Sequence, residues 1–425
     1  MCKGESYIRI LRLTPHFYYP PGIVSEWKVH LDPIGGMQTQ IFRMTTALSK
    51  LGIAQKVLTI GMKNAPKTWR INKNTEICSS NIPIIPIRSR VRGTVGLNIY
   101  WGVGVCLRVI SLLLTSLFNK KNSWDLIHSH CSGVAAPLIV GLLSKWILKK
   151  PLVYTVHCCR IGTYEPMNRF DRLINKYVVK IEGYCLGKAD SVITLTERTK
   201  KLLTSSYKNV TSEKVFVIPD IISIEEFNQN INESNLEYFY NSFGVPRDKP
   251  VISFVGRIAH EKGWKYFLEA VRLCDNKDFH AVFCGDGNER EYLDKMVDDY
   301  CLKDRVTITG FIPNSLVAAG IYISDIMVIP SVHEELGSVL LEVASLKKPV
   351  IASAVGGLTE NITNNTSGIL VKPKSPEMIA QSIDFILSNK EMGKKFGANL
   401  YNHVRDNFHE SKELNKLIDC YKNLI

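Results

Sequence analysis

Short apolar runs alternate with amphipathic segments through the first half of the chain. Strand-like runs occur at residues 7–13, 54–61, 125–130, 151–157 and 191–196. A helix is predicted at residues 35–53, where apolar residues recur at helical spacing and Gly52 gives a stop signal. Because strands that alternate with helices form parallel sheets covered on both faces, this pattern predicts an α/β unit that ends near Asp220.

The same pattern restarts after a polar connector with some helix at residues 223–249. Further strands are predicted at residues 251–257, 280–287, 305–311, 326–331, 349–353 and 368–371. The simplest architecture is two doubly wound α/β domains, 1–222 and 223–409, facing each other across a cleft. In such sheets ligands bind at the carboxyl ends of the strands. The tail, residues 410–425, is predicted to be an amphipathic helix.

Residues 99–118 are nearly as apolar and as long as a membrane span. Arg108 lies near the centre of the segment, where a charge is costly in lipid. The segment is therefore predicted to be a buried or membrane-grazing helix, which leaves weak peripheral membrane contact open.

Charge and cysteine content narrow the class of partner. The 425-residue chain is 45% hydrophobic and has a formal net charge of +13. That excess suits an anionic partner, but no aromatic-basic motif or zinc-finger spacing indicates nucleic acid. Phosphate-bearing substrates and anionic lipid remain. Eleven scattered cysteines without a CxxC pair, and no signal-peptide-like start, favour reduced thiols and a cytoplasmic location.

Two loops of the second half carry candidate phosphate ligands. VGRIAHEKG places Arg257 just after a strand and Lys262 five residues later. Two cations at the carboxyl edge of a sheet suit a pyrophosphate, although a solvated loop with ordinary surface charges is the alternative. CGDG follows another strand, and Gly285 and Gly287 permit a tight turn with close backbone approach. Alone, this Gly-x-Gly equally fits a plain turn.

The first half offers a glycine pair and three histidines. Gly35 and Gly36 precede the first predicted helix, where backbone N–H groups favour an anion, and a simple loop turn is the alternative. His157 ends a strand, which raises the chance of substrate contact. His128 and His130 lie similarly, but at least one of them is expected to pack structurally.

The stretch PSVHEELGSVLLE, residues 330–342, contains two spaced carboxylates. Gly337 is expected to start a helix, with Glu334 just ahead of its N-terminus and Glu342 two turns up. Carboxylates are acceptors for vicinal diols, so the pair suits two sugar groups of one ligand.

Several motifs occur along the chain in this order: the amino-terminal GGMQ, GRIAHEKG, CGDG, ITGFIP, the E-x7-E stretch and PVIASAVGG. Taken together, they resemble those of retaining glycosyltransferases of family four, which have the GT-B fold. The resemblance covers nearly the whole chain. It departs at Pro219-Asp220-Ile221, where the family usually has Pro-Asn-Gly, which leaves the interdomain turn uncertain.

The resemblance implies roles for individual residues. Arg257 and Lys262 would hold the donor diphosphate, Glu342 the ribose, and Glu334 the donor sugar. His157 would lie near the reacting bond, and Gly36 against the phosphates or sugar. Phe311 and Ile312 would lie beside the base, and the backbone N–H groups around Gly337, Ser338 and Val339 would lie near the sugar and phosphate. Gly285 would be a further donor-site residue. The tail helix would return to the first domain. Transfer would retain configuration, and without an Asp-x-Asp no metal or other cofactor is expected.

Residues 16–40, HFYYPPGIVSEWKVHLDPIGGMQTQ, resemble enzymes of aminoglycoside biosynthesis that attach N-acetylglucosamine from UDP-N-acetylglucosamine to 2-deoxystreptamine. The implied product is 2′-N-acetylparomamine. This acceptor is an aminocyclitol with two positive charges, so nearby acids are expected. Candidate acceptor ligands are Glu26, Trp27, Asp32 and Glu165, with surface acids and a packed tryptophan as alternatives. Tyr18 also could stack on a ring or pack.

Three other functions compete. A family-four transferase acting on a lipid-linked or cell-envelope acceptor would suit the basic charge and residues 99–118. A non-catalytic sugar-nucleotide-binding protein is disfavoured, because every expected donor-site position is filled. A dinucleotide-dependent oxidoreductase fails, since no strand precedes a full G-x-G-x-x-G with its acidic partner.

Overall fold

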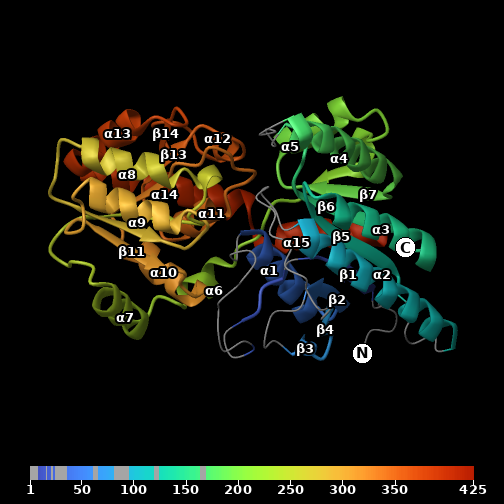
Figure 1. Cartoon of the computed structure of the whole chain (residues 1–425). Coiled ribbons are helices and arrows are strands. Elements are labelled where there is room, and N and C mark those ends of the chain that lie inside the picture. The colour runs from blue at the N-terminus through green and yellow to red at the C-terminus, as the bar shows by residue number, and fades with distance from the viewer. Residues whose placement is uncertain are drawn as a thin grey trace. The chain divides into compact units, whose positions relative to one another are not determined.

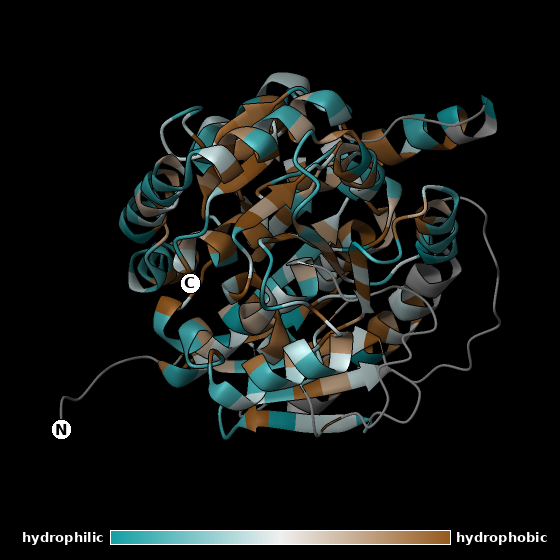
Figure 2. Cartoon of the chain, turned by 90° about the vertical axis from the view of Figure 1, so that its left-hand side faces the viewer, coloured by the Kyte–Doolittle hydropathy of each residue, from teal (hydrophilic) through white to brown (hydrophobic). Residues whose placement is uncertain are grey.

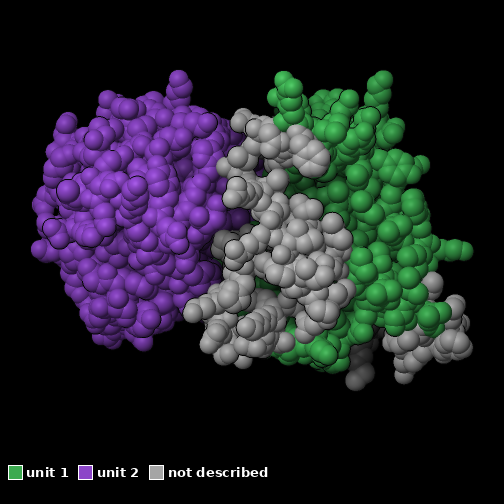
Figure 3. All heavy atoms as spheres, viewed as in Figure 1, with its two compact units in different colours: residues 1–219, 411–425 green, residues 220–410 purple. Residues whose placement is uncertain are grey.

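The computed structural model describes residues 8–15, 17–20, 23, 36–60, 66–80, 95–118, 124–162 and 169–425. The chain forms two compact units, Met1–Pro219 with Ser411–Ile425, and Asp220–Glu410 (Figure 3). The first unit ends at Pro219, three residues before the predicted boundary at 222. It resumes at Ser411, one residue after the predicted start of the tail helix at 410.

The first unit is built on an eight-stranded sheet in the order β3-β4-β2-β1-β5-β6-β7-β8. The strands are β1 (Arg9–Leu13), β2 (Ala54–Ile60), β3 (Thr68–Asn72), β4 (Thr75–Ser80), β5 (Leu126–Ser132), β6 (Leu152–Cys158), β7 (Ser191–Thr194) and β8 (Val215–Val217). All neighbouring strands are parallel except β3, which pairs antiparallel with β4. The predicted parallel sheet is thus confirmed, with one antiparallel edge strand that was not predicted.

Helices cover the first sheet (Figure 1), and the side chains on its two faces differ in chemistry. They are α1 (Gly36–Lys50), α2 (Val95–Phe118), α3 (Ala135–Leu148), α4 (Arg169–Lys188), α5 (Glu197–Ser206) and α15 (Glu410–Lys422). Apolar side chains of α2, α3 and α4 pack on one face against strand residues such as Leu11 and Ile127. The intervening strand residues Arg12 and His128 point to the opposite face, where His128 contacts Tyr421 of α15.

The second unit is built on a six-stranded parallel sheet in the order β11-β10-β9-β12-β13-β14. The strands are β9 (Val251–Val255), β10 (His280–Cys284), β11 (Val306–Gly310), β12 (Ile326–Ile329), β13 (Val350–Ser353) and β14 (Ile369–Val371). The strand order runs outward from β9 in one direction and then restarts at β12 on its other side. This reversal makes the gap beyond the carboxyl ends of β9 and β12 the expected ligand position.

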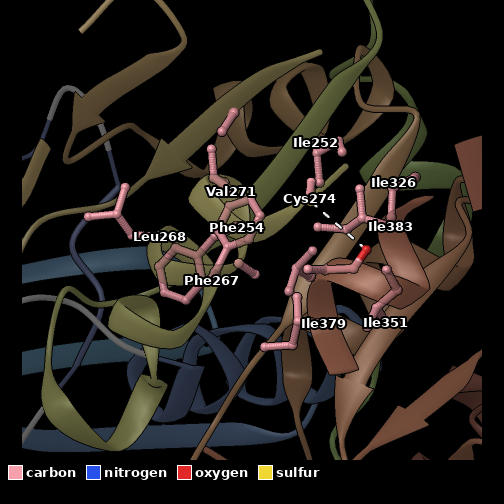
Figure 4. Packing of buried hydrophobic residues seen from close by; sticks show 14 of the residues in the cluster. Ile252, Phe254, Phe267, Leu268, Val271, Cys274, Ile326, Ile351, Ile379 and Ile383 are labelled. Carbon is pink, nitrogen blue, oxygen red and sulfur yellow. Dashed lines mark hydrogen bonds between the residues drawn. The ribbon is translucent and has the colours of Figure 1, made fainter. Parts of the chain in front are cut away.

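Alternating strand residues give this second sheet two hydrophobic faces. Ile252 and Phe254 pack with α8 (Trp264–Leu273) and α13 (Pro376–Ser388), as Figure 4 shows. On the other face, Val251 packs with α7 (Glu233–Phe243) and α10 (Asn314–Tyr322). The remaining helices are α6 (Ile224–Asn228), α9 (Arg290–Asp299), α11 (Ser338–Ser345), α12 (Leu358–Asn361) and α14 (Lys390–Asn407). Figure 2 shows hydrophobic residues gathered in the strands and hydrophilic residues along the helices.

Each strand predicted from an apolar run is confirmed to within a few residues. The hairpin of β3 and β4 was missed, although Trp69 and Ile77 alternate with polar residues around a two-residue turn at Lys73. The apolar segment 99–118 is helical, as predicted: α2 buries Trp101 and exposes Leu107. Of the helices within the described ranges, none is long and apolar enough to cross a membrane.

Candidate active site

The loops after β9 and β12 meet where the strand order of the second sheet reverses. The first loop runs from Gly256 into the short 3-10 helix η3 (His260–Lys262), and the second precedes α11. The backbone N–H groups of Val332 and His333 both donate to the carbonyl oxygen of Glu261, at 2.9 and 3.2 Å. The two loops that carry the predicted donor ligands are therefore joined through their backbones.

Glycines let two further loops approach this junction. Gly285, after β10, has φ +153°, and a Cβ there would collide with the carbonyl oxygen of Gly256. Gly356, after β13, has φ +52°, and a Cβ there would collide with the carbonyl oxygen of Glu334. The close backbone approach predicted for Gly285 is present, so four loops form one layer beyond the strand ends.

Lys262 and Glu334 form the ion pair of this site. The Lys262 Nζ donates to Glu334 Oε2 at 2.7 Å, and Ser331 Oγ donates to the same oxygen at 3.0 Å. The Glu334 side chain is 13% exposed and that of Lys262 is 26% exposed. Among the described residues both bonds of Glu334 end on Oε2, and the ammonium uses one of its three N–H groups. Oε1 and two N–H groups remain for a ligand.

The helix after this loop begins later than expected. Gly337 is the N-cap, and α11 starts at Ser338. Glu342 is consequently the fifth residue of α11 and lies about one turn into the helix, so the predicted two turns were wrong. The seven residues between the glutamates are only partly helical, because Glu335, Leu336 and Gly337 belong to the loop. Glu342 is buried.

Ser338 already has a partner within the second unit. Its Oγ donates to Asp220 Oδ2 at 2.7 Å, and Asp220 is buried. Asp220 replaces the asparagine usual in the resembled family. The structure thus places an acid at the first residue of α11, next to the predicted donor residues Gly337 and Val339. The sequence marks Asp220 as a domain boundary and as a departure from the family's Pro-Asn-Gly, but nothing in the local sequence indicates this contact.

The other predicted donor residues lie on neighbouring loops of the second unit. Arg257 follows β9, and its Nε lies 3.9 Å from Glu261 Oε1. Phe311 and Ile312 follow β11. The Ile312 side chain is buried in the cluster that includes Phe239, whereas Phe311 is half-buried.

In the first unit, His157 lies near the end of β6 within a buried polar network. Its Nε2 lies 3.0 Å from Nδ1 of His130, whose Nε2 lies 2.6 Å from Nη1 of Arg12. Burial, and after it the charge of Arg12, lowers the pKa of His157 to about 3. Gly36, the other candidate here, is the first residue of α1.

The network explains the two other histidines. His128 accepts from Arg12 and hydrogen-bonds to Tyr421 and Thr155, so its side chain is held inside the unit, as was expected for at least one of the two. His130 instead bridges Arg12 and His157. The burial of Arg12 was not predicted, because an arginine in YIRILRL has the pattern of an exposed strand residue.

All four predicted acceptor ligands lie outside the described residues, namely Glu26, Trp27, Asp32 and Glu165. Tyr18 is described, and its ring packs 5.1 Å from that of Phe42. Tyr18 is buried beside Phe42, which favours packing over stacking on a ligand ring. Across the residues that the structure describes, no group of three or more metal-ligating side chains is present.

Two family models match the chain, one over most of each unit. Residues 34–226 match the model described as Glycosyltransferase Family 4. Residues 239–403 match the model described as Glycosyl transferases group 1. The second match contains the four loops that follow β9, β10, β12 and β13.

Curated relatives and solved structures agree with these matches. The chain is 35% identical over 370 residues to the 2-deoxystreptamine N-acetyl-D-glucosaminyltransferase of Streptomyces fradiae, covering 86% of this chain and 85% of that protein. It is 34% identical over 358 residues to the 2-deoxystreptamine glucosyltransferase of Streptomyces kanamyceticus, covering 83% and 90%. Sucrose-phosphate synthase from Thermosynechococcus elongatus has a TM-score of 0.77 at 21% identity, over 98% and 99% of the two chains. The chain therefore belongs to the family-four glycosyltransferases and has their GT-B fold.

Proposed function

We propose that this enzyme transfers N-acetylglucosamine from UDP-N-acetylglucosamine to 2-deoxystreptamine, with retention, and releases UDP and 2′-N-acetylparomamine. The observation that carries the proposal is the Lys262–Glu334 pair at the reversal of the second sheet, in a chain similar over most of its length to two 2-deoxystreptamine transferases. The acceptor is common to both relatives, but the donor sugar is not.

The donor would be held by the second unit. The free N–H groups of Lys262, with Arg257, would bind the diphosphate as its negative charge grows. Oε1 of Glu334 would accept from a sugar hydroxyl, and Glu342 would accept from the ribose. The Lys262 ammonium and the Glu334 carboxylate lie 2.7 Å apart. A cation and an acceptor this close together suit a ligand in which phosphate and sugar are adjacent.

The reaction would exchange one bond to the anomeric carbon for another. The bond from C1 to the phosphate oxygen breaks, and a hydroxyl oxygen of 2-deoxystreptamine bonds to C1 on the same face. The hydroxyl proton passes to the departing phosphate. The protein contributes orientation and charge stabilisation, with no residue as nucleophile. No metal or other cofactor is proposed.

A donor competition tests the donor and the stereochemistry. The purified enzyme is incubated with 2-deoxystreptamine and equal amounts of UDP-N-acetylglucosamine and UDP-glucose. The proposal expects an N-acetylhexosamine adduct whose anomeric proton coupling is that of an α-glycoside. A hexose adduct would change the donor, and a β-glycoside would contradict retention.

A lipid-linked or cell-envelope acceptor is the second candidate, because apolar side chains lie exposed on two helices of the first unit. The exposed apolar residues are Val103, Leu107, Ile110 and Leu114 on α2, and Leu173, Ile174, Tyr177 and Tyr184 on α4. Lys176 and Lys180 are exposed between those of α4. Basic amphipathic faces of this kind suit an anionic lipid surface. Co-sedimentation with phosphatidylglycerol vesicles, together with transfer to an extracted lipid acceptor, would favour this function.

A further inference from the structure

A buried chain of hydrogen bonds links β1 to His157 through His130. Arg12 is fully buried, and its Nη1 lies 2.6 Å from His130 Nε2. His130 Nδ1 lies 3.0 Å from His157 Nε2, and the two rings stack with centroids 5.2 Å apart. The three side chains come from the adjacent strands β1, β5 and β6.

The order of donors along this chain follows from the chemistry of arginine. A guanidinium only donates, so Nε2 of His130 must accept. A neutral imidazole that accepts at one nitrogen carries its proton on the other, so His130 donates from Nδ1 to Nε2 of His157. His157 must then carry its own proton on Nδ1. Within the described residues no hydrogen bond from that Nδ1 is formed.

The surroundings keep these imidazoles neutral. Arg12 has no carboxylate partner among the described residues; its Nε and Nη2 donate to the Gln55 amide oxygen at 3.3 and 2.9 Å. The amide nitrogen of Gln55 donates to Thr45 and Thr75, which fixes the orientation of that amide. An imidazolium beside a buried, unneutralised guanidinium would be strongly disfavoured.

The second branch of the network is consistent with this order. His128 Nδ1 lies 3.2 Å from Arg12 Nη1 and 2.7 Å from the Tyr421 hydroxyl, so it accepts from both. His128 Nε2 then donates to Thr155 Oγ1 at 2.7 Å. Among the described residues, the titratable groups around this hydrogen-bonded network are Arg12, His128 and His130, with Tyr421 and Cys420 from α15. None of them is a carboxylate that would stabilise a protonated His157.

We propose that Arg12 is a positioning residue that acts through His130 to hold His157 as the neutral Nδ1–H tautomer. His157 then offers a hydrogen-bond donor to a hydroxyl of the donor sugar and acts neither as acid nor as base. The identity of that ligand rests on the proposed function, whereas the tautomer is a property of the free enzyme. Arg12 of YIRILRL and His130 of IHSH would thus act together to set the tautomer of His157.

Nitrogen NMR of the free enzyme tests the tautomer without any assay of transfer. The protein is labelled with ¹⁵N-histidine, and the His157 signals are identified among the ten histidines by their loss in His157→Asn. Wild type should show a protonated Nδ1 and an unprotonated Nε2 that do not titrate between about pH 5.5 and 8. A protonated Nε2, or an imidazolium in this range, would overturn the proposal even if transfer is observed.

Two substitutions at His130 test whether the chain sets that tautomer. In His130→Gln the amide oxygen can accept from Arg12 and the amide nitrogen can donate to His157, so His157 should remain Nδ1–H. In His130→Leu the donor to Nε2 is gone, and both tautomers of His157 should appear. We expect kcat to fall roughly 10-fold or more in His130→Leu with little change in the acceptor KM, and to recover in His130→Gln.

An unchanged His157 tautomer in folded His130→Leu would contradict the role of the chain. If that variant does not fold, the spectra of wild type and His130→Gln decide: both must show Nδ1–H. If no donor or acceptor is ever turned over, the NMR result still stands, and only the proposed function fails.

Discussion

The Nζ of Lys262 lies 2.7 Å from Oε2 of Glu334, although 72 residues separate them in sequence. The pair connects the loops after β9 and β12, the two strands between which the order of the second sheet reverses. In the ligand-free protein each group compensates the charge of the other. In the proposed complex a sugar diphosphate would bind both groups, since among the described residues each retains unused hydrogen-bonding capacity.

Replacing Lys262 should remove charge stabilisation of the leaving diphosphate. We expect Lys262→Ala to lower kcat/KM by about 100-fold or more. Lys265→Ala is the matched control, because Lys265 lies on the adjacent helix α8 and pairs only weakly, at 3.7 Å, with Glu269. Steady-state UDP release with saturating acceptor measures both. Equal activity in the two variants would show that Lys262 does not take part in donor binding or catalysis.

Neutralising Glu334 should weaken donor-sugar recognition while preserving shape. Glu334→Gln retains an acceptor oxygen but loses the charge that binds Lys262 and a sugar hydroxyl. A loss of kcat/KM of about 10- to 100-fold is expected, since hydrogen bonds to charged groups contribute about 1.5–3 kcal/mol. Glu391→Gln, at an exposed ion pair on α14, should change nothing measurable. Wild-type kinetics in Glu334→Gln would refute the assignment.

A methyl group at Gly356 should disturb the loop layer beneath Glu334. Gly356 and Gly244 have similar positive φ values, +52° and +63°, but only at Gly356 would a Cβ strike a backbone carbonyl. Gly244→Ala should therefore cost about 1 kcal/mol of unfolding free energy, from left-handed strain alone. Gly356→Ala should cost roughly 3 kcal/mol or more and reduce transfer as well.

Urea unfolding of both glycine variants, followed by circular dichroism, measures the difference. Equal destabilisation would mean that the loop after β13 shifts easily, and that close packing against the carbonyl oxygen of Glu334 does not hold it in place.

Acid should destabilise the first unit before it protonates most carboxylates. Burial lowers the pKa of His128, His130 and His157 from 6.5, to about 3 for His157. The unfolded chain therefore binds protons below about pH 6.5 that the folded chain does not, and stability falls as the pH drops. Each such histidine contributes up to about 1.4 kcal/mol per pH unit in this window.

Unfolding free energies at about pH 7.5, 6 and 5 test this linkage. His157→Asn should reduce the slope by about one proton. A stability that stays constant from pH 7.5 to 5 would show that these histidines are not held neutral.

Chelation should leave transfer intact, because the proposed charge stabilisation comes from Arg257 and Lys262. We expect equal rates with EDTA and with added Mg²⁺. A rate that falls at least 10-fold in EDTA and recovers with Mg²⁺ would assign charge stabilisation to a metal.

The sequence predicted what is local and missed what depends on distant packing. Strand positions and donor loops follow from apolar runs and from glycines that adjoin them. Glu342 was misplaced by about a turn, since the start of α11 depends on the loop around Gly337 packing against Leu358. The proposed role of Arg12 could not be predicted, because its two histidine partners stand more than 100 residues away and Tyr421, which also contacts His128, lies on α15, the last helix of the chain.

The most direct measurement is mass spectrometry of the purified enzyme incubated with UDP-N-acetylglucosamine and 2-deoxystreptamine. The account predicts a product heavier than 2-deoxystreptamine by one N-acetylhexosamine residue, formed together with UDP and formed about 10- to 100-fold more slowly with Glu334→Gln. UDP that appears only through slow hydrolysis, with no adduct of the acceptor, would contradict the proposed reaction.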